Sequence, residues 1–206
     1  MSTILLALSI SILGATASPA NLQEGDLVFQ ESRSGQSVAV SAATHSPLTH
    51  MGVITIIKGS PHVFEAVAPS TGRVGATPFS AWRARGVRSR VWVKRLKDHA
   101  TLLTPPTLKR MKEVANSFVG RPYDKLFRWG TEKLYCSELV YNVYLVGAGL
   151  SVGAVQQVRD LDLEPPSVQR LIRARLKKRL DTSDLIITPA MMFSDPRLET
   201  VMEPAQ

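Results

Sequence analysis

Short runs of apolar residues, separated by turn residues, fill the first half of this chain. Their length and their content of Val, Ile and Phe are typical of buried strands. We predict strands at residues 27–29, 51–57, 62–67 and 91–93. The turn residues 58–61 lie between two of these runs, which predicts a hairpin. Short helices are predicted at residues 38–43 and 80–85.

The second half of the chain has helical periodicity. Apolar residues share one face of a segment that Pro105 opens and Gly120 closes, which predicts a helix. Residues 137–146 continue with apolar residues at helical spacing and stop at Gly147, so Cys136 stands at the start of a second helix.

The chain then closes with residues 185–188, a predicted last strand that Pro189 ends before a polar finish. A β-rich front, helices and a closing strand together predict an α+β fold.

The N-terminal segment differs from the rest of the chain. Residues 4–13 form an apolar run, and the small residues 15–18 after it suit signal peptidase, so we predict a signal peptide over residues 1–20 and a single domain over residues 21–206. A buried N-terminal helix is the alternative. The run is shorter than the ~20 apolar residues of a membrane span, so the mature chain is expected to have no transmembrane span. Because a signal peptide directs export, the mature chain is expected to be periplasmic or secreted.

The net charge of +8 and the pI near 9.9 favour an anionic partner such as cell-wall polymer or a membrane surface. The cations are dense from Arg170 to Leu180, interleaved with apolar residues at helical spacing. This region is either the solvated face of an amphipathic helix or a contact with an anionic surface. No nucleic-acid-binding motif accompanies it, so no nucleic-acid partner is expected.

Cys136 is the only cysteine, so it cannot form an internal disulfide. Its thiol is either buried and inert or has a functional role. Its position at the start of a helix favours a functional role, because the free backbone N–H groups there lower the pKa of a thiol. The same N–H groups can donate to a developing oxyanion.

A thiol nucleophile needs a base, and the candidates are His45, His50, His62 and His99. We favour His50, because it leads into a predicted strand that would hold its ring rigidly. Glu65 lies in the second arm of the predicted hairpin, on the face opposite its neighbours Phe64 and Ala66. It is a candidate to orient the imidazole, and an exposed edge-strand carboxylate is the alternative.

Five segments, taken in order, resemble the permuted papain-like cysteine hydrolases of the YiiX/YebB type. That group belongs to the wider NlpC superfamily, which includes peptidoglycan peptidases and lecithin:retinol acyltransferase. The segments are Gly25-Asp26, Thr49-His50-Met51-Gly52-Val53, Phe64-Glu65-Ala66, Gly120-Arg121-Pro122-Tyr123-Asp124 and Tyr135-Cys136-Ser137-Glu138-Leu139-Val140.

The resemblance implies a circularly permuted papain-like fold, with an antiparallel sheet packed against helices and the nucleophile at a helix N-terminus. It implies Cys136 as nucleophile, His50 as base and Glu65 as the orienting residue. Tyr123 would line the cleft, with a packed core aromatic as the alternative. Tyr135 and Glu138 are further candidates for substrate contact, although Glu138 would equally suit a helix cap.

These residues predict an exported cysteine hydrolase that cleaves an amide bond, most simply in peptidoglycan-derived or other cell-envelope peptides. The alternatives are a lipid acyl hydrolase or acyltransferase at the membrane surface, and a non-catalytic envelope-binding module. No cofactor is expected. No metal is expected either, because no two His share metal-binding helical spacing and one Cys cannot form a thiolate cluster.

Overall fold

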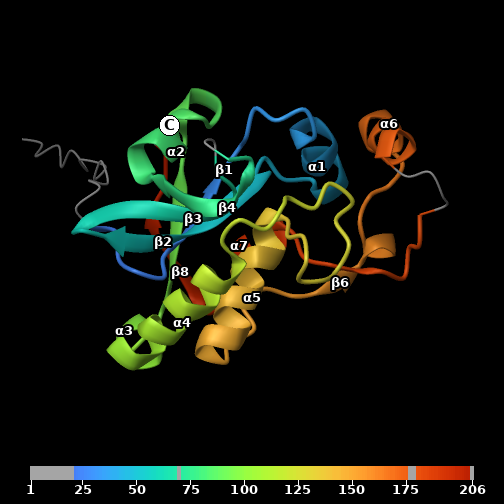
Figure 1. The fold of residues 1–206 in the computed structure, drawn as a ribbon. Helices are drawn as coiled ribbons and strands as arrows, with labels where there is room; N and C mark the ends of the chain where they lie inside the picture. Colours follow the sequence, from blue (N-terminus) through green and yellow to red (C-terminus); the bar gives the residue numbers. More distant parts are fainter. Residues whose placement is uncertain (1–20, 69–70, 176–179, 205–206) are drawn as a thin grey trace, which may run out of the picture.

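The computed structural model describes residues 21–68, 71–175 and 180–204. At its centre is a six-stranded antiparallel sheet with the strand order β4-β3-β2-β1-β5-β8 (Figure 1). Its strands are β1 (Leu27–Gln30), β2 (His50–Ile57), β3 (Ser60–Ala68), β4 (Arg73–Pro78), β5 (Trp92–Leu96) and β8 (Leu198–Met202). A second, two-stranded sheet pairs β6 (Gln156–Gln157) with β7 (Leu185–Ile186).

Helices cover both faces of the large sheet (Figure 1). They are α1 (Ser37–Thr44), α2 (Phe79–Ala84), α3 (His99–Leu102), α4 (Pro105–Phe118), α5 (Cys136–Ala148), α6 (Pro166–Arg175) and α7 (Pro189–Phe193). Among the described residues, short 3-10 helices include η2 (Val87–Ser89) and η3 (Val158–Asp160). Among the described residues, no helix is long and apolar enough to cross a membrane.

The alternation of side chains along the strands builds two cores. In β1, Leu27 and Phe29 pack with α4 and α5 on one face, while Val28 packs with Trp82 of α2 on the other. In β3, Phe64 joins the first core and Val63 the second, so Glu65 lies on the α2 face. The α+β prediction is confirmed.

The predicted hairpin is β2 and β3, joined by a two-residue turn. Ile57 pairs with Ser60, and both turn residues have positive φ, 49° for Lys58 and 76° for Gly59. This is the type I′ geometry that suits the twist of paired strands, and glycine adopts it without strain. The hairpin places the start of β2 beside the second half of β3, where the candidate histidine and glutamate lie.

The predicted end of the cysteine helix is wrong. The helix α5 continues through Gly147 and ends at Ala148, and Gly149 after it has the left-handed φ of 71° that is typical of a helix C-terminus. Gly147 has a packing role instead, because a Cβ on it would lie 2.6 Å from the Met111 Cα in α4. The glycine therefore lets the two helices approach closely.

The predicted last strand is also largely wrong. Only Leu185 and Ile186 pair, and Pro189 begins α7 rather than ending a strand, with the Thr188 hydroxyl accepting a hydrogen bond from the Met191 N–H at 3.3 Å. The polar finish contains β8, an edge strand that the sequence did not predict. The strand β4 was missed too, since its sequence RVGATP holds Gly, Ala and Pro, which rarely mark a strand.

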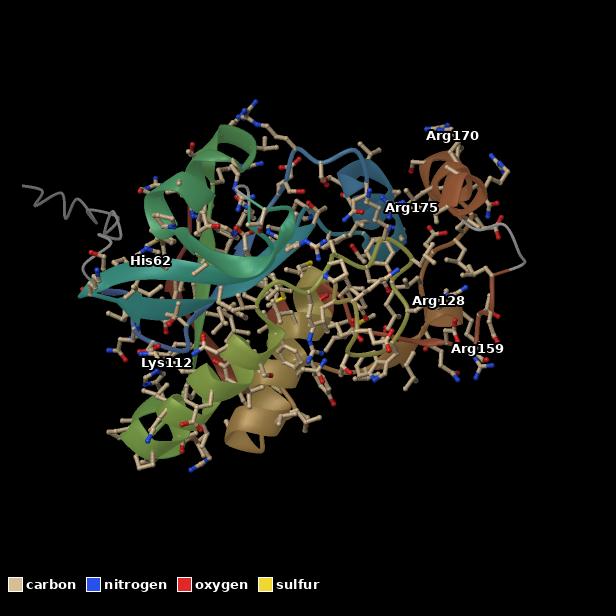
Figure 2. The ribbon with its side chains drawn as sticks, in the orientation of Figure 1. His62, Lys112, Arg128, Arg159, Arg170 and Arg175 are labelled. Atoms are coloured by element: carbon tan, nitrogen blue, oxygen red, sulfur yellow. The ribbon has the colours of Figure 1, made fainter. Side chains whose placement is uncertain are left out.

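The predicted signal peptide lies outside the described residues. Of the predicted basic helix, the part in α6 is amphipathic: Val168, Leu171 and Ile172 pack against α1, while Arg170 and Arg173 face outward. Arg170 stands at the outer side of α6 in Figure 2. Residues 176–179 lie outside the described residues.

Candidate active site

His50 and Glu65 form a buried pair on the α2 face of the sheet. The His50 Nε2 lies 2.7 Å from the Glu65 Oε2, and the side chains are 8% and 0% exposed. The two residues lie diagonally across the β2–β3 pair, on either side of Gly52. A Cβ on Gly52 would lie 2.3 Å from the Val63 Cγ1, so this glycine permits the close strand contact that the pair needs.

Two donors hold the other oxygen of Glu65. The Thr77 hydroxyl of β4 donates to Oε1 at 2.6 Å, and the Arg85 Nη2, just after α2, donates to it at 2.5 Å. Burial acts to raise the pKa of Glu65, but hydrogen bonds and charge from His50 and Arg85 outweigh it and lower the pKa. Glu65 is therefore a fixed carboxylate that faces the imidazole.

The His50 ring lies between Glu65 and the Cys136 thiol. Burial alone would lower the pKa of His50, but hydrogen bonding and charge from Cys136 and Glu65 outweigh it and raise the pKa to about 9. Because Glu65 occupies Nε2, Nδ1 is the nitrogen left to face the thiol. The ring stacks on the fully buried Trp82, with centroids 5.9 Å apart and planes at 30°.

Cys136 is a free, buried cysteine and the first residue of α5. Tyr135 before it has extended dihedrals, and the N–H groups of the first helical turn have no partners within the helix. These N–H groups and the helix dipole place partial positive charge beside the sulfur. The structure thus brings Cys136, His50 and Glu65 together in one line of contacts, thiol to imidazole to carboxylate, which we call the row.

The other histidines lie elsewhere. His45 is exposed and its Nε2 is 3.2 Å from an Asp162 oxygen, His62 contacts its own strand end, and His99 contacts the Glu24 carbonyl. Among the histidines, all of which the structure describes, His50 is thus the one beside the thiol.

Cys136 opens onto a largely apolar cavity that is partly open to solvent. The walls come from α1, α6, the segment before α5, and β7. The apolar lining includes Ala39, Val40, Ala43, Val158, Leu161, Leu163, Val168, Leu171, Ile172, Leu180, Ile186 and Ile187. Tyr123 and Tyr135 complete the wall near the sulfur, and Lys125 and Arg175 are its cations.

The further predicted site residues take different positions. Tyr123 lines the cavity, as the sequence predicted, and its hydroxyl accepts a hydrogen bond from the Gln36 Nε2 at 2.7 Å. Tyr135 also lines it, but its hydroxyl accepts from the Ile187 N–H at 3.2 Å and so ties the residue before α5 to the residue after β7. Glu138 is fully buried outside the lining, and a substrate contact for it stays a prediction that this placement does not favour.

Sequence reasoning missed the residues that support the row. Thr77 and Arg85 come from β4 and α2, and only the fold brings them to Glu65. Trp82 and Gln36 carried no motif either. A basic residue at the end of a predicted helix would have been the signal for Arg85. Conversely, Asp26 of the Gly25-Asp26 motif lies away from the Cys136 sulfur and forms a bidentate ion pair with Arg95.

A buried cysteine at a helix start, a histidine on an earlier strand and a carboxylate on the next strand define a cysteine hydrolase of permuted papain-like fold. Comparison with known proteins agrees. Residues 21–202 match the family of permuted papain-like amidase enzymes, YaeF/YiiX, C92, and the chain belongs to this family.

A curated relative is the uncharacterized protein YiiX of Escherichia coli strain K12. It is 34% identical over 198 residues, which cover 96% of this chain and 93% of YiiX. The crystal structure of metalloprotein yiiX from Escherichia coli O157:H7 is similar too, with 35% identity and a TM-score of 0.81. The match covers 88% of this chain and 97% of that one.

The name of that Escherichia coli structure calls yiiX a metalloprotein. In the described part of this chain, no group of three or more His, Cys, Asp or Glu is arranged to hold a metal ion. The cysteine row does not offer one, because His50 occupies one Glu65 oxygen, and Thr77 and Arg85 occupy the other. These residues do not fit a metal centre.

Proposed function

We propose that the protein hydrolyses an amide bond through Cys136, His50 and Glu65, with a thioester on Cys136 as the intermediate. The row of contacts from the Glu65 carboxylate through the His50 ring to the thiol supports these roles. The fully buried Trp82 stacks on the imidazole. A non-catalytic binding module would not require these contacts between Cys136, His50 and Glu65.

Each proton has a defined route. His50 takes the Cys136 proton, and the sulfur attacks the carbonyl carbon. The C–N bond then breaks as the imidazolium returns the proton to the leaving amine. Water, deprotonated by His50, attacks the thioester and releases a carboxylic acid and the free thiol. Glu65 stays ionised and stabilises the imidazolium throughout.

The cavity bears on the substrate. Its aliphatic lining beside Cys136 favours a substrate whose acyl group is a hydrocarbon chain. The lipid acyl hydrolase predicted as an alternative thereby gains support over the cell-envelope peptide. The net charge of +8 supports either envelope substrate, since both are found with anionic polymers or lipids. Transfer instead of hydrolysis requires only that an amine or alcohol replace water.

A chain-length series tests the proposal. Purified protein is given acetyl, octanoyl and palmitoyl amides of one amine, and separately peptidoglycan fragments, with Cys136→Ala as the control. We expect kcat/KM to rise with chain length, by up to roughly fourfold per buried CH₂ at about 0.8 kcal/mol each. Turnover of peptidoglycan fragments alone would return the assignment to the envelope peptide, and equal products from Cys136→Ala would remove the thiol from the mechanism.

A pair of variants on α1 tests the cavity itself. Ala39 is 5% exposed and lines the cavity, whereas its neighbour Val38 is 69% exposed. Ala39→Phe fills the cavity, so it should abolish the advantage of the palmitoyl amide while leaving the acetyl amide unchanged. Val38→Phe is the matched control and should behave as wild type. Equal loss on both amides would mean that Ala39→Phe had disturbed the sulfur rather than the chain site.

Export and location in the periplasm or outside the cell form part of this proposal and rest on residues 1–20. Contact of the Arg170 to Leu180 region with an anionic surface is proposed on its charge. Cell fractionation and flotation with anionic vesicles test them respectively.

A further inference from the structure

Tyr123 is tied to the segment that leads into the cysteine helix. It forms a parallel β-bridge with Leu134, and the Asp124 N–H donates to the Leu134 carbonyl at 3.1 Å. Two residues later the chain reaches Cys136, and Tyr123 and Cys136 line the same cavity. The Tyr123 ring therefore has a fixed place beside the reacting sulfur.

Gln36, the residue before α1, connects Tyr123 to α6. Its Nε2 donates to the Tyr123 hydroxyl oxygen at 2.7 Å, and its Oε1 accepts from the Arg175 Nη2 at 2.8 Å. Arg175 is itself held, because its Nη1 donates to the Lys125 carbonyl at 2.8 Å and its guanidinium lies over the Phe127 ring. Figure 2 shows Arg175 between α6 and α1.

Arginine fixes which way the Gln36 amide faces. A guanidinium has only donors, so the amide oxygen must face Arg175. The amide nitrogen must then face Tyr123, whatever the ambiguity between the two ends of a glutamine side chain. The Tyr123 oxygen thus accepts a hydrogen bond, and its own proton points elsewhere. In the described residues no acceptor receives that proton.

Burial also raises the pKa of Tyr123, which keeps the hydroxyl protonated. A protonated phenol with a free O–H, held in the wall beside a cysteine nucleophile, matches what a carbonyl oxygen needs as negative charge develops on it. The unpaired N–H groups at the start of α5 are a second set of donors that such an oxygen could accept from.

We propose that Gln36, locked by Arg175, is a positioning residue that aims the Tyr123 O–H at the carbonyl oxygen of the substrate bound to Cys136. This inference rests on the proposed thioester mechanism. Tyr123 touches the substrate, and Gln36 and Arg175 act through it. No bond is made or broken by these three residues, since the phenol keeps its proton and only lends a hydrogen bond.

The test is Gln36→Glu, which keeps the shape and the link to Arg175 but reverses the polarity toward Tyr123. A carboxylate oxygen accepts the phenol proton and turns it away from the substrate. The assay is the rate of Cys136 acylation by the para-nitrophenyl ester of a fatty acid. We expect Tyr123→Phe and Gln36→Glu each to lower this rate, by roughly a hundredfold for the loss of one donor, with KM little changed.

A double-mutant cycle separates positioning from mere structure. If Gln36 acts through the phenol proton, Gln36→Glu has no further effect once Tyr123→Phe is present. Arg175→Lys, which still donates to Gln36, should retain most of the rate, whereas Arg175→Met should lose it only when Tyr123 is intact. Thermal unfolding of each variant verifies the fold.

The outcomes distinguish the two levels of inference. Acylation of wild type with additive losses from Gln36→Glu and Tyr123→Phe overturns the positioning role alone. A folded wild type that forms no acyl-enzyme overturns the proposed mechanism, and the positioning role with it.

Discussion

The Glu138 carboxyl and the Gly130 backbone are joined by a hydrogen bond in which the Gly130 N–H donates to Oε1 at 2.7 Å. Glu138 lies in the first turn of the cysteine helix, and Gly130 lies in the segment that carries part of the cavity wall. Burial raises the pKa of Glu138 to about 8, although the Gly130 N–H acts to lower it. A buried carboxyl, largely protonated at neutral pH, therefore links the wall to the helix.

This link predicts a pH-dependent stability. The folded protein holds the Glu138 proton up to about pH 8, whereas the unfolded chain releases it near the ordinary value of 4.5. The free energy of unfolding should therefore fall as pH rises between these two values. Glu138→Gln cannot ionise, so its Tm should fall less over this range. Glu132→Gln, on the exposed surface of the same segment, should keep the wild-type curve, and parallel curves for all three proteins would contradict the prediction.

The close strand contact at Gly52 predicts a large effect for a single methyl group. In Gly52→Ala the added Cβ would meet the Val63 Cγ1 at 2.3 Å and the Phe64 carbonyl oxygen at 2.7 Å. Relieving this contact pushes β3 from β2 and costs about 1–3 kcal/mol of stability. It also moves Glu65 from His50, so activity per folded molecule should fall. Gly35→Ala is the control, because nothing lies within 4 Å of a Cβ there.

The local part of this site could be predicted from the sequence. Strand patterning and turn residues gave the β2–β3 hairpin, and the hairpin put His50 near Glu65. Helical periodicity with Cys136 at its start gave the helix N-terminus. The order of the motifs supplied the rest of the row. Each of these patterns depends on a few residues that are close in the sequence, which explains why it could be predicted.

The parts that were missed depend on contacts between distant segments. Gln36 and Arg175 are 139 positions apart, and Arg85 meets Glu65 across 20 positions. Neither pair leaves a periodic pattern. Gly147 resembled a helix end because glycine commonly ends helices, and only the approach of α4 reveals its packing role. The cavity likewise exists only once α1 and α6 meet.

The pH dependence of catalysis follows from the charge on His50. Because its pKa is raised to about 9, the imidazolium that protonates the leaving amine persists through neutral pH and is lost above that value. We expect kcat/KM to decline on the basic side near pH 9. Glu65→Gln removes a carboxylate that raises this pKa, so the basic limb should move to lower pH. A limb that stays in place in Glu65→Gln would mean that another group controls it.

The Asp26–Arg95 pair leads to a prediction about stability rather than chemistry. Asp26 is fully buried, and its two oxygens accept from the Arg95 Nε at 2.6 Å and Nη2 at 2.7 Å. Arg95→Met leaves the carboxylate buried without its partner, which costs about 3–5 kcal/mol. Adding Asp26→Asn removes that charge and should restore much of the loss in urea unfolding. Because the pair joins β5 to the start of β1 and lies away from Cys136, kcat/KM per folded molecule should stay at the wild-type value in both variants. A fall in kcat/KM at full folding would instead give the Gly25-Asp26 motif a part in the reaction.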